Sequence, residues 1–186
     1  MIVAFRFQPA GLDGIVLVDS TRHTDQRGWF QECFKQAEFA AAGIRGPFVQ
    51  ENHSRSALGV VRGLHYQLPP ASQGKLVRCT AGEVFDVAVD IRGESPTFAK
   101  WYGTKLAATR SNLLWIPAGF AHGFQALADG SELLYLVTAE YEPRLDRSIR
   151  VDDPAIGIRW PLPPAGLSAK DRAAPTLAKA ELPVMS

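Results

Sequence analysis

The fold of this chain is most tightly constrained by a series of short apolar runs that glycine and proline separate. Eight such runs, rich in β-branched and aromatic residues, lie at residues 14–19, 60–66, 75–81, 82–92, 98–106, 111–116, 123–127 and 132–138. Short runs bounded by turn residues are typical of consecutive antiparallel strands. So many strands with so little helix between them favour a mainly all-β double-sheet jelly roll over an alternating α/β sheet.

Helical periodicity is scarce. Residues 36–42 predict one short helix, and further short helices are expected at about residues 167–182. There Ser168 stands three residues before Asp171, which resembles a helix-capping arrangement. A chain of 186 residues is long enough for one sizeable core, so we expect a single domain over residues 1–186, in which only 161–166 resembles a linker.

The charge balance argues against partners that need a strong electrostatic field. A net charge of +1 with 21% charged residues gives no global attraction to nucleic acid or to a membrane surface. No apolar run reaches the roughly 20 residues that span a bilayer. Cys33 and Cys79 lack CxxC spacing, and Arg6 and Pro9 interrupt any signal-like start. We therefore expect a soluble cytoplasmic protein with free thiols.

Residues 62–67, which read RGLHYQ, place an arginine and a histidine on one strand-like run. This pair suggests acid/base chemistry on an anionic substrate. The alternative is structural: His65 is then a hydrogen-bonded core histidine, and Arg62 pairs with a surface carboxylate.

Residues 117–124, which read PAGFAHGF, resemble the second conserved motif of cupin barrels. In a metal-binding cupin the companion motif places two histidines one residue apart, because alternate strand residues face the same lumen. Here Gln67 stands where the second histidine would follow His65. Two neutral nitrogens are fewer ligands than a stable zinc or iron site uses, so we expect no metal. The structural alternative for His122 is a lumen histidine held by its neighbours.

Several motifs and their spacing together resemble the dTDP-4-dehydrorhamnose 3,5-epimerase family, from about Val18 to Pro175. The segments that carry the resemblance are residues 25–28, 50–54, 62–67, 73–75, 117–124, 134–135 and 168–171. The resemblance implies a cupin-type double-stranded β-helix. It also implies a cofactor-independent isomerase that inverts carbons 3 and/or 5 of a dTDP-linked 4-keto-6-deoxyhexose. In the family's reaction a proton leaves one face of the ring, through an enolate, and returns on the other.

The resemblance assigns four catalytic roles. His65 would be the base, and Asp171 would orient its ring and stabilise the imidazolium. Lys75 would offset the charge on the enolate oxygen, and Tyr135 would return the proton. Without the family, Asp171 at a helix start would more often be a cap, Lys75 could equally be a solvated turn lysine, and periodicity alone favours Tyr135 as an ordinary inward strand aromatic.

The resemblance also implies a substrate-binding set. Arginines suit the diphosphate because guanidinium groups bind oxyanions through paired hydrogen bonds, and aromatic rings suit the thymine. The implied set is Arg27, Phe30, Glu32, Gln50, Asn52, Arg62, His122, Tyr141, Asp146 and Lys170. Asp146 stands where several relatives have glutamate. Family members are homodimers that exchange N-terminal segments, so Arg27 and Glu32 would then act in the neighbouring subunit.

Competing functions differ in class. The nearest alternative is a single-centre 5- or 3-epimerase from a specialised deoxysugar pathway, which sequence spacing cannot separate from a double epimerase. A ketoisomerase of the same barrel is disfavoured, because ketoisomerases are not expected to share both the RGLHYQ motif at 62–67 and the SAKD motif at 168–171. A non-catalytic sugar-nucleotide-binding cupin would predict loss of the base, the lysine or the donor. A metal-dependent dioxygenase is disfavoured by the missing histidine.

Overall fold

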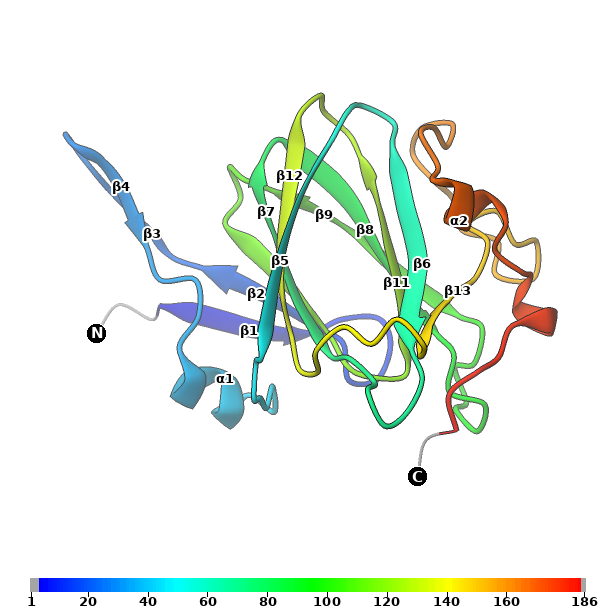
Figure 1. Cartoon of the computed structure of the whole chain (residues 1–186). Coiled ribbons are helices and arrows are strands. Elements are labelled where there is room, and N and C mark those ends of the chain that lie inside the picture. Colours follow the sequence, from blue (N-terminus) through cyan, green and yellow to red (C-terminus); the bar gives the residue numbers. More distant parts are fainter. Residues whose placement is uncertain (1–3, 185–186) are drawn as a thin grey trace.

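The computed structural model describes residues 4–184. In it two antiparallel sheets face each other as a flattened barrel (Figure 1). The six-stranded sheet has the order β1-β2-β10-β7-β12-β5, and the five-stranded sheet has the order β13-β6-β11-β8-β9. The larger sheet is built from β1 (Phe5–Pro9), β2 (Val16–Ser20), β5 (Gln50–Ser56), β7 (Lys75–Ala81), β10 (Asn112–Ile116) and β12 (Ser131–Val137). The smaller is built from β6 (Val61–Gln67), β8 (Glu83–Asp90), β9 (Trp101–Ala107), β11 (Phe120–Ala126) and β13 (Asp146–Ser148).

The predicted fold class is confirmed: the chain is mainly β and forms a cupin-type jelly-roll barrel. Each of the eight predicted runs overlaps a strand. The predicted helix at 36–42 is α1 (Gln36–Ala41), and the C-terminal region holds α2 (Ala169–Arg172) and the 3-10 turn η1 (Leu177–Lys179). Five strands come from segments outside the eight predicted runs, namely β1, β3 (Arg22–Asp25), β4 (Gly28–Gln31), β5 and β13. Within residues 4–184 no helix is both long and apolar enough to cross a membrane.

The main core lies between the two sheets and follows strand alternation. On β10, Leu114 and Ile116 face the core between the sheets, whereas Leu113 and Trp115 pack on the other face with Phe39 of α1. Successive strand side chains point to opposite faces, so a strand covered on both sides is apolar throughout. This explains why residues 112–116 are all buried.

The outer face of the five-stranded sheet is covered by the C-terminal part of the chain. Ile149, Ile156 and Leu177 pack against Leu64 and Tyr66 of β6 in a second apolar cluster. Figure 1 shows α2 beside β6 as a result. Packing of the C-terminal segment thus brings residues about a hundred positions apart to one side of the barrel.

The β3–β4 hairpin projects away from the barrel (Figure 1). Trp29 is 60% exposed and Phe30 is 66% exposed. The Arg22 guanidinium lies 3.9 Å from the centre of the Trp29 ring. Within residues 4–184, two large aromatic side chains on this extended arm thus remain mostly exposed.

Candidate active site

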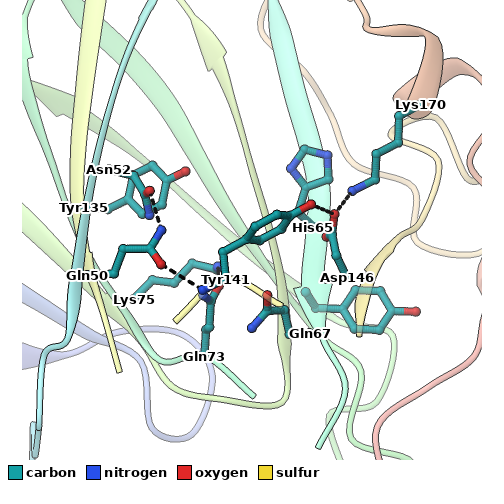
Figure 2. Close-up of a pocket in the computed structure, with 11 residues that line it drawn as sticks. Gln50, Asn52, His65, Gln67, Gln73, Lys75, Tyr135, Tyr141, Asp146 and Lys170 are labelled. Atoms are coloured by element: carbon teal, nitrogen blue, oxygen red, sulfur yellow. Dashed lines mark hydrogen bonds and ion pairs between the residues drawn. The ribbon is translucent and has the colours of Figure 1, made fainter. Parts of the chain in front are cut away.

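A polar cavity of about 310 Å³ opens at one end of the space between the sheets (Figure 2). Along the strands that reach the cavity, the inward residues change from polar to apolar. On β7 the inward residue Lys75 lines the cavity, and the next inward residues, Val77 and Cys79, belong to the core. On β12, Leu133 lies in the core and Tyr135 lines the cavity. The barrel is therefore filled by apolar side chains at one end and lined by polar ones at the other. The lining residues are Gln50, Asn52, His65, Tyr66, Gln67, Gln73, Lys75, Tyr135, Tyr141, Asp146 and Lys170.

His65 and Asp171 form a hydrogen-bonded pair at one wall. The distance from His65 Nε2 to Asp171 Oδ1 is 2.7 Å, and the Asp171 side chain is 3% exposed. Because a carboxylate accepts, Nε2–H donates to it, and Nδ1 is the ring nitrogen left to act as a base. The predicted cap is also confirmed, since Ser168 Oγ accepts from the Asp171 backbone N–H. The backbone N–H of Asp171 therefore takes part in the cap of α2, and its side chain accepts the hydrogen bond from His65.

Asp171 is held in its ionised form. Burial by itself would raise the pKa of this carboxyl, but hydrogen bonds from His65, from the Ser168 side chain and from the Gly63 backbone lower it. The net shift of the pKa is downward. An ionised Asp171 stabilises positive charge on the His65 ring, which a base acquires when it takes a proton.

Gly63 allows β6 to approach β11 closely. A Cβ atom at Gly63 would lie 2.6 Å from the Cα of Gly123, and its φ of +133° is one that side-chain-bearing residues rarely adopt. Here the β6–β11 register also shifts, between the pairs His122–His65 and Phe124–Arg62. Irregularities of this kind re-aim side chains next to functional sites.

Lys75 is a buried cation in the cavity wall. It is 6% exposed, and its Nζ donates to Gln73 Oε1 over 2.8 Å. Burial lowers the pKa of Lys75 to about 8, although the Asp146 charge acts in the opposite direction. An ammonium with this pKa is mostly protonated at neutral pH and has been taken out of bulk water. It is therefore suited to stabilise negative charge that develops on a substrate oxygen.

Tyr135 lies on the wall opposite His65. It comes from β12 of the six-stranded sheet, whereas His65 comes from β6 of the five-stranded sheet, and Figure 2 shows the two rings apart on either side of the cavity. Burial raises the pKa of the Tyr135 phenol, with the Arg62 charge opposing. Tyr135 thus keeps its proton at neutral pH and can donate it from the side opposite the base.

A second histidine–carboxylate pair lies deeper. His122 Nε2 is 2.9–3.0 Å from the two oxygens of Asp86, and both residues are buried. The His122 and Tyr135 rings meet edge-on with centroids 6.2 Å apart. His122 is therefore held by a neighbour, as the structural alternative expected, and it is also adjacent to the proposed donor. Asp86 was not among the predicted site residues.

The rim of the cavity carries five of the predicted substrate-binding residues. Tyr141 Oη donates to Asp146 Oδ2 over 2.9 Å, and Lys170 forms a short ion pair with the same oxygen. Gln50 Nε2 donates to Asn52 Oδ1 over 2.8 Å. Tyr141 is 55% exposed, so its ring is free to receive a flat ligand.

The remaining predicted residues lie outside the cavity lining. Arg62 bonds to Ser56 Oγ and to the Arg55 carbonyl, close enough for its charge to act on Tyr135. Arg27 pairs with Asp25 at the tip of the hairpin, with 85% of its side chain exposed. Phe30 and Glu32 lie on the same arm or directly after it. The structure of one chain thus does not bring these three arm residues to the cavity.

Gln67 occupies the place of the missing metal-ligand histidine and is already engaged. Its Nε2 donates to the carbonyls of Ala71 and Glu140, and its Oε1 accepts from the Glu142 N–H. Among residues 4–184 no group of three or more histidine, cysteine, aspartate or glutamate side chains is arranged to hold a metal ion. The side chains that line this end of the barrel are therefore mainly acids, bases and amides that are not grouped as metal ligands.

In comparisons with known proteins, the family model, a sequence relative and two solved structures are all described as sugar-nucleotide epimerases. The family model described as dTDP-4-dehydrorhamnose 3,5-epimerase matches residues 9–179. The dTDP-4-dehydrorhamnose 3,5-epimerase of Salmonella typhimurium is 51% identical over 172 residues, 90% of this chain and 93% of that protein. The crystal structure of a dTDP-6-deoxy-D-glucose-3,5-epimerase from Legionella pneumophila, in complex with dTDP-4-keto-L-rhamnose, has 42% identity and a TM-score of 0.94, covering 98% of this chain and 99% of that one. A 3'-monoepimerase from Streptomyces bikiniensis, in complex with dTDP-quinovose, has 36% identity and a TM-score of 0.89, covering 95% and 92%.

Proposed function

Because this chain belongs to the dTDP-4-dehydrorhamnose 3,5-epimerase family, we propose that it is an isomerase that inverts carbons 3 and/or 5 of a dTDP-linked 4-keto-6-deoxyhexose without a cofactor. The observation that carries the proposal is the placement of His65 and Tyr135 on opposite walls, with the Lys75 ammonium in the same cavity. Inversion of a carbon requires removal of a proton from one face and delivery to the other.

The reaction begins when His65 Nδ1 takes the hydrogen from a carbon beside the ketone. The electron pair of the broken C–H bond moves into an enolate, and Lys75 stabilises the negative oxygen. Tyr135 then gives its proton to the same carbon from the opposite face, and the ketone re-forms. His65 releases its proton and Tyr135 regains one from solvent, so protons balance over the cycle. Ionised Asp171 stabilises the imidazolium that exists between these steps.

The cavity rim supports binding of the nucleotide part. The exposed Tyr141 ring is positioned to stack on a flat base, while Lys170 and Arg62 supply positive charge for the diphosphate. Gln50, Asn52 and Asp146 would form hydrogen bonds to the sugar or the nucleoside. His122 would support the site through its contact with Tyr135.

The function is tested by NMR in deuterated water with dTDP-4-keto-6-deoxyglucose as substrate. We expect deuterium to enter at the carbons that flank the ketone, because each proton taken by His65 is replaced from solvent through Tyr135. Exchange at both carbons with an inverted product identifies a double epimerase. Exchange at one carbon identifies the single-centre alternative, which the similarity to a 3'-monoepimerase keeps open. No exchange by the folded protein would instead indicate a binding module.

We further propose that the active unit is a homodimer in which the β3–β4 hairpin of one subunit completes the cavity of the other. The hairpin projects from its own barrel and exposes Trp29 and Phe30 (Figure 1). It also carries Arg27, a cation of the kind that the diphosphate requires. Exchange of such an arm buries its aromatics and brings Arg27, Phe30 and Glu32 to a substrate.

This arrangement predicts complementation between two inactive variants. One variant carries His65→Ala, and the other carries Arg27→Ala with Phe30→Ala on the hairpin. A heterodimer purified through two different tags should recover about half of the wild-type activity, because one of its two cavities then contains an intact base and receives an intact hairpin. The measurement is turnover per dimer against both homodimeric variants. If the hairpin serves its own barrel, every cavity in the heterodimer is defective and no activity returns.

We also propose a cytoplasmic location and a single functional domain over residues 1–186. Cys33 and Cys79 are free thiols, which a reducing compartment maintains.

A further inference from the structure

The segment that carries Tyr141 is held by the side chains of three glutamines. Gln73 Nε2 donates to the Ala139 carbonyl over 2.8 Å. Gln67 bonds to the next residue, Glu140, at its carbonyl over 3.1 Å and to the Glu142 N–H over 2.8 Å. Gln50 Oε1 accepts from the Tyr141 N–H over 2.8 Å. Each residue from 139 to 142 thus has a backbone group bonded to a glutamine that lines the cavity.

Gln73 differs from the other two glutamines because its amide oxygen also bonds to Lys75. Its Oε1 accepts from Lys75 Nζ over 2.8 Å, and the residue is 9% exposed. The orientation of this amide is fixed by its partners: the carbonyl of Ala139 requires the NH2 group, and the ammonium requires the oxygen. A flipped amide would place donor against donor and acceptor against acceptor. Next to it, the Gly74 N–H bonds to Thr138 Oγ1 over 2.8 Å, which fixes the backbone in the same register.

We propose that Gln73 is a positioning residue that directs the Lys75 ammonium into the cavity and links it to the 138–142 segment that carries Tyr141. An ammonium has three N–H donors, and one of them donates to Gln73 Oε1. The others are then free to meet an oxygen of a ligand in the cavity that Lys75 lines. A neutral amide suits this role better than a carboxylate, because it orients the cation without neutralising its charge.

The proposed role rests on the proposed function for its catalytic consequence, but the contact itself can be measured independently. In Gln73→Leu the ammonium loses its acceptor, so the pKa of Lys75 should fall below that of wild type. In Gln73→Glu a negative charge replaces the neutral oxygen, so the pKa of Lys75 should rise above that of wild type. Titration of selectively labelled lysine 13Cε signals measures both shifts, with Lys75→Arg used to assign the signal.

Kinetics distinguish a role of Gln73 in positioning Lys75 from a role in supporting the 138–142 segment alone. With Gln73→Leu we expect kcat to fall about 10–100-fold with KM within about three-fold, because the lost interaction matters most when the enolate forms. The alkaline limb of the kcat/KM profile should move to lower pH in Gln73→Leu and to higher pH in Gln73→Glu. The matched control is Gln67→Leu, which loosens the same segment without touching Lys75. It should raise KM and leave the lysine titration unchanged.

The outcomes are distinct. Wild-type kcat together with a wild-type Lys75 titration in Gln73→Leu would overturn the inference, as would an equal pKa shift in Gln67→Leu. If Gln73→Leu fails to fold, Gln73→Asn keeps an amide too short to reach both partners and should show the same direction of change. If the wild-type protein exchanges no sugar-nucleotide proton while the titration shifts appear as stated, the proposed function fails and the contact between Gln73 and Lys75 stands.

Discussion

Replacing His65 with alanine should lower kcat/KM by about 10²–10⁴-fold, because general base catalysis contributes that much. The variant should still bind dTDP, since Tyr141, Lys170 and Arg62 are untouched. Substrate turnover and deuterium exchange should be lost together, since both begin with the same proton removal. The measurements are a stopped assay of the epimerised product, NMR exchange, and calorimetric titration with dTDP.

The matched control for this variant is His53→Ala. His53 lies half-exposed on β5, where its Nε2 is 3.1 Å from Glu132, and it faces away from the cavity. Turnover in this control should equal that of wild type. An intermediate result is expected for Asp171→Asn, which keeps the size of the side chain but removes the charge that stabilises the His65 imidazolium. Full activity in His65→Ala would contradict the assigned base.

Replacing Lys75 with methionine should damage catalysis and stabilise the fold at the same time. Loss of the cation should lower kcat by about 10²–10³-fold, as for removal of other groups that stabilise an oxyanion. The free energy of unfolding at neutral pH should rise by roughly 1–2 kcal/mol, because burying a charge is costly and methionine has a similar volume. Gln73 Oε1 loses a partner in this variant, which limits the gain.

The pH dependence of stability gives this prediction a second readout. Burial lowers the pKa of Lys75 to about 8, whereas its ordinary value is 10.5. Between these values the unfolded chain binds the proton more readily than the native chain, so wild-type stability gains a contribution as pH rises through this window. Lys75→Met lacks that contribution. Urea unfolding at pH 7 and pH 10 should therefore show the difference between variant and wild type shrinking at the higher pH.

The control here is Lys105→Met. Lys105 is half-exposed on β9 and pairs with Glu83 over 3.1 Å, so its loss should change neither kcat nor the pH dependence of stability by a comparable amount. A Lys75→Met variant that is less stable than wild type at pH 7, or that turns over at the wild-type rate, would contradict the description of Lys75 as a buried catalytic cation.

Sequence periodicity found β6, β7 and β12, which combine core residues with site residues, and missed β5, whose cavity-lining residues are all polar. Residues 50–56 read QENHSRS, and this strand alternates between partly buried and exposed positions without an apolar face. Its inward residues include Gln50 and Asn52, which line the cavity. A strand whose inward residues are polar lacks the alternation of apolar and polar residue types by which strands are recognised in a sequence. The hairpin of β3 and β4 was missed for a related reason, because its residues are mostly exposed in one chain.

The site was predictable where family motifs exist and less so where partners are distant. His65, Lys75, Tyr135 and Asp171 could be named from motifs, but their arrangement on opposite walls depends on how the two sheets face each other. Asp86 carried a signal that could have been used: a charged residue in the apolar run between Val84 and Ala88 is unusual and calls for a partner. Gln73 stands in the motif at 73–75, but no sequence pattern pointed to its contact with Ala139, which lies 66 positions away.

The most direct test of the central claim is a crystal structure of this protein with dTDP-6-deoxyglucose, whose reduced carbon 4 prevents the reaction. We predict that the sugar lies in the cavity with His65 Nδ1 about 3–3.5 Å from a carbon next to carbon 4. The oxygen on carbon 4 should face Lys75, and Tyr135 should face the opposite side of the ring. A sugar bound elsewhere, or a His65 ring turned out of the cavity or bound to a metal ion, would contradict the account.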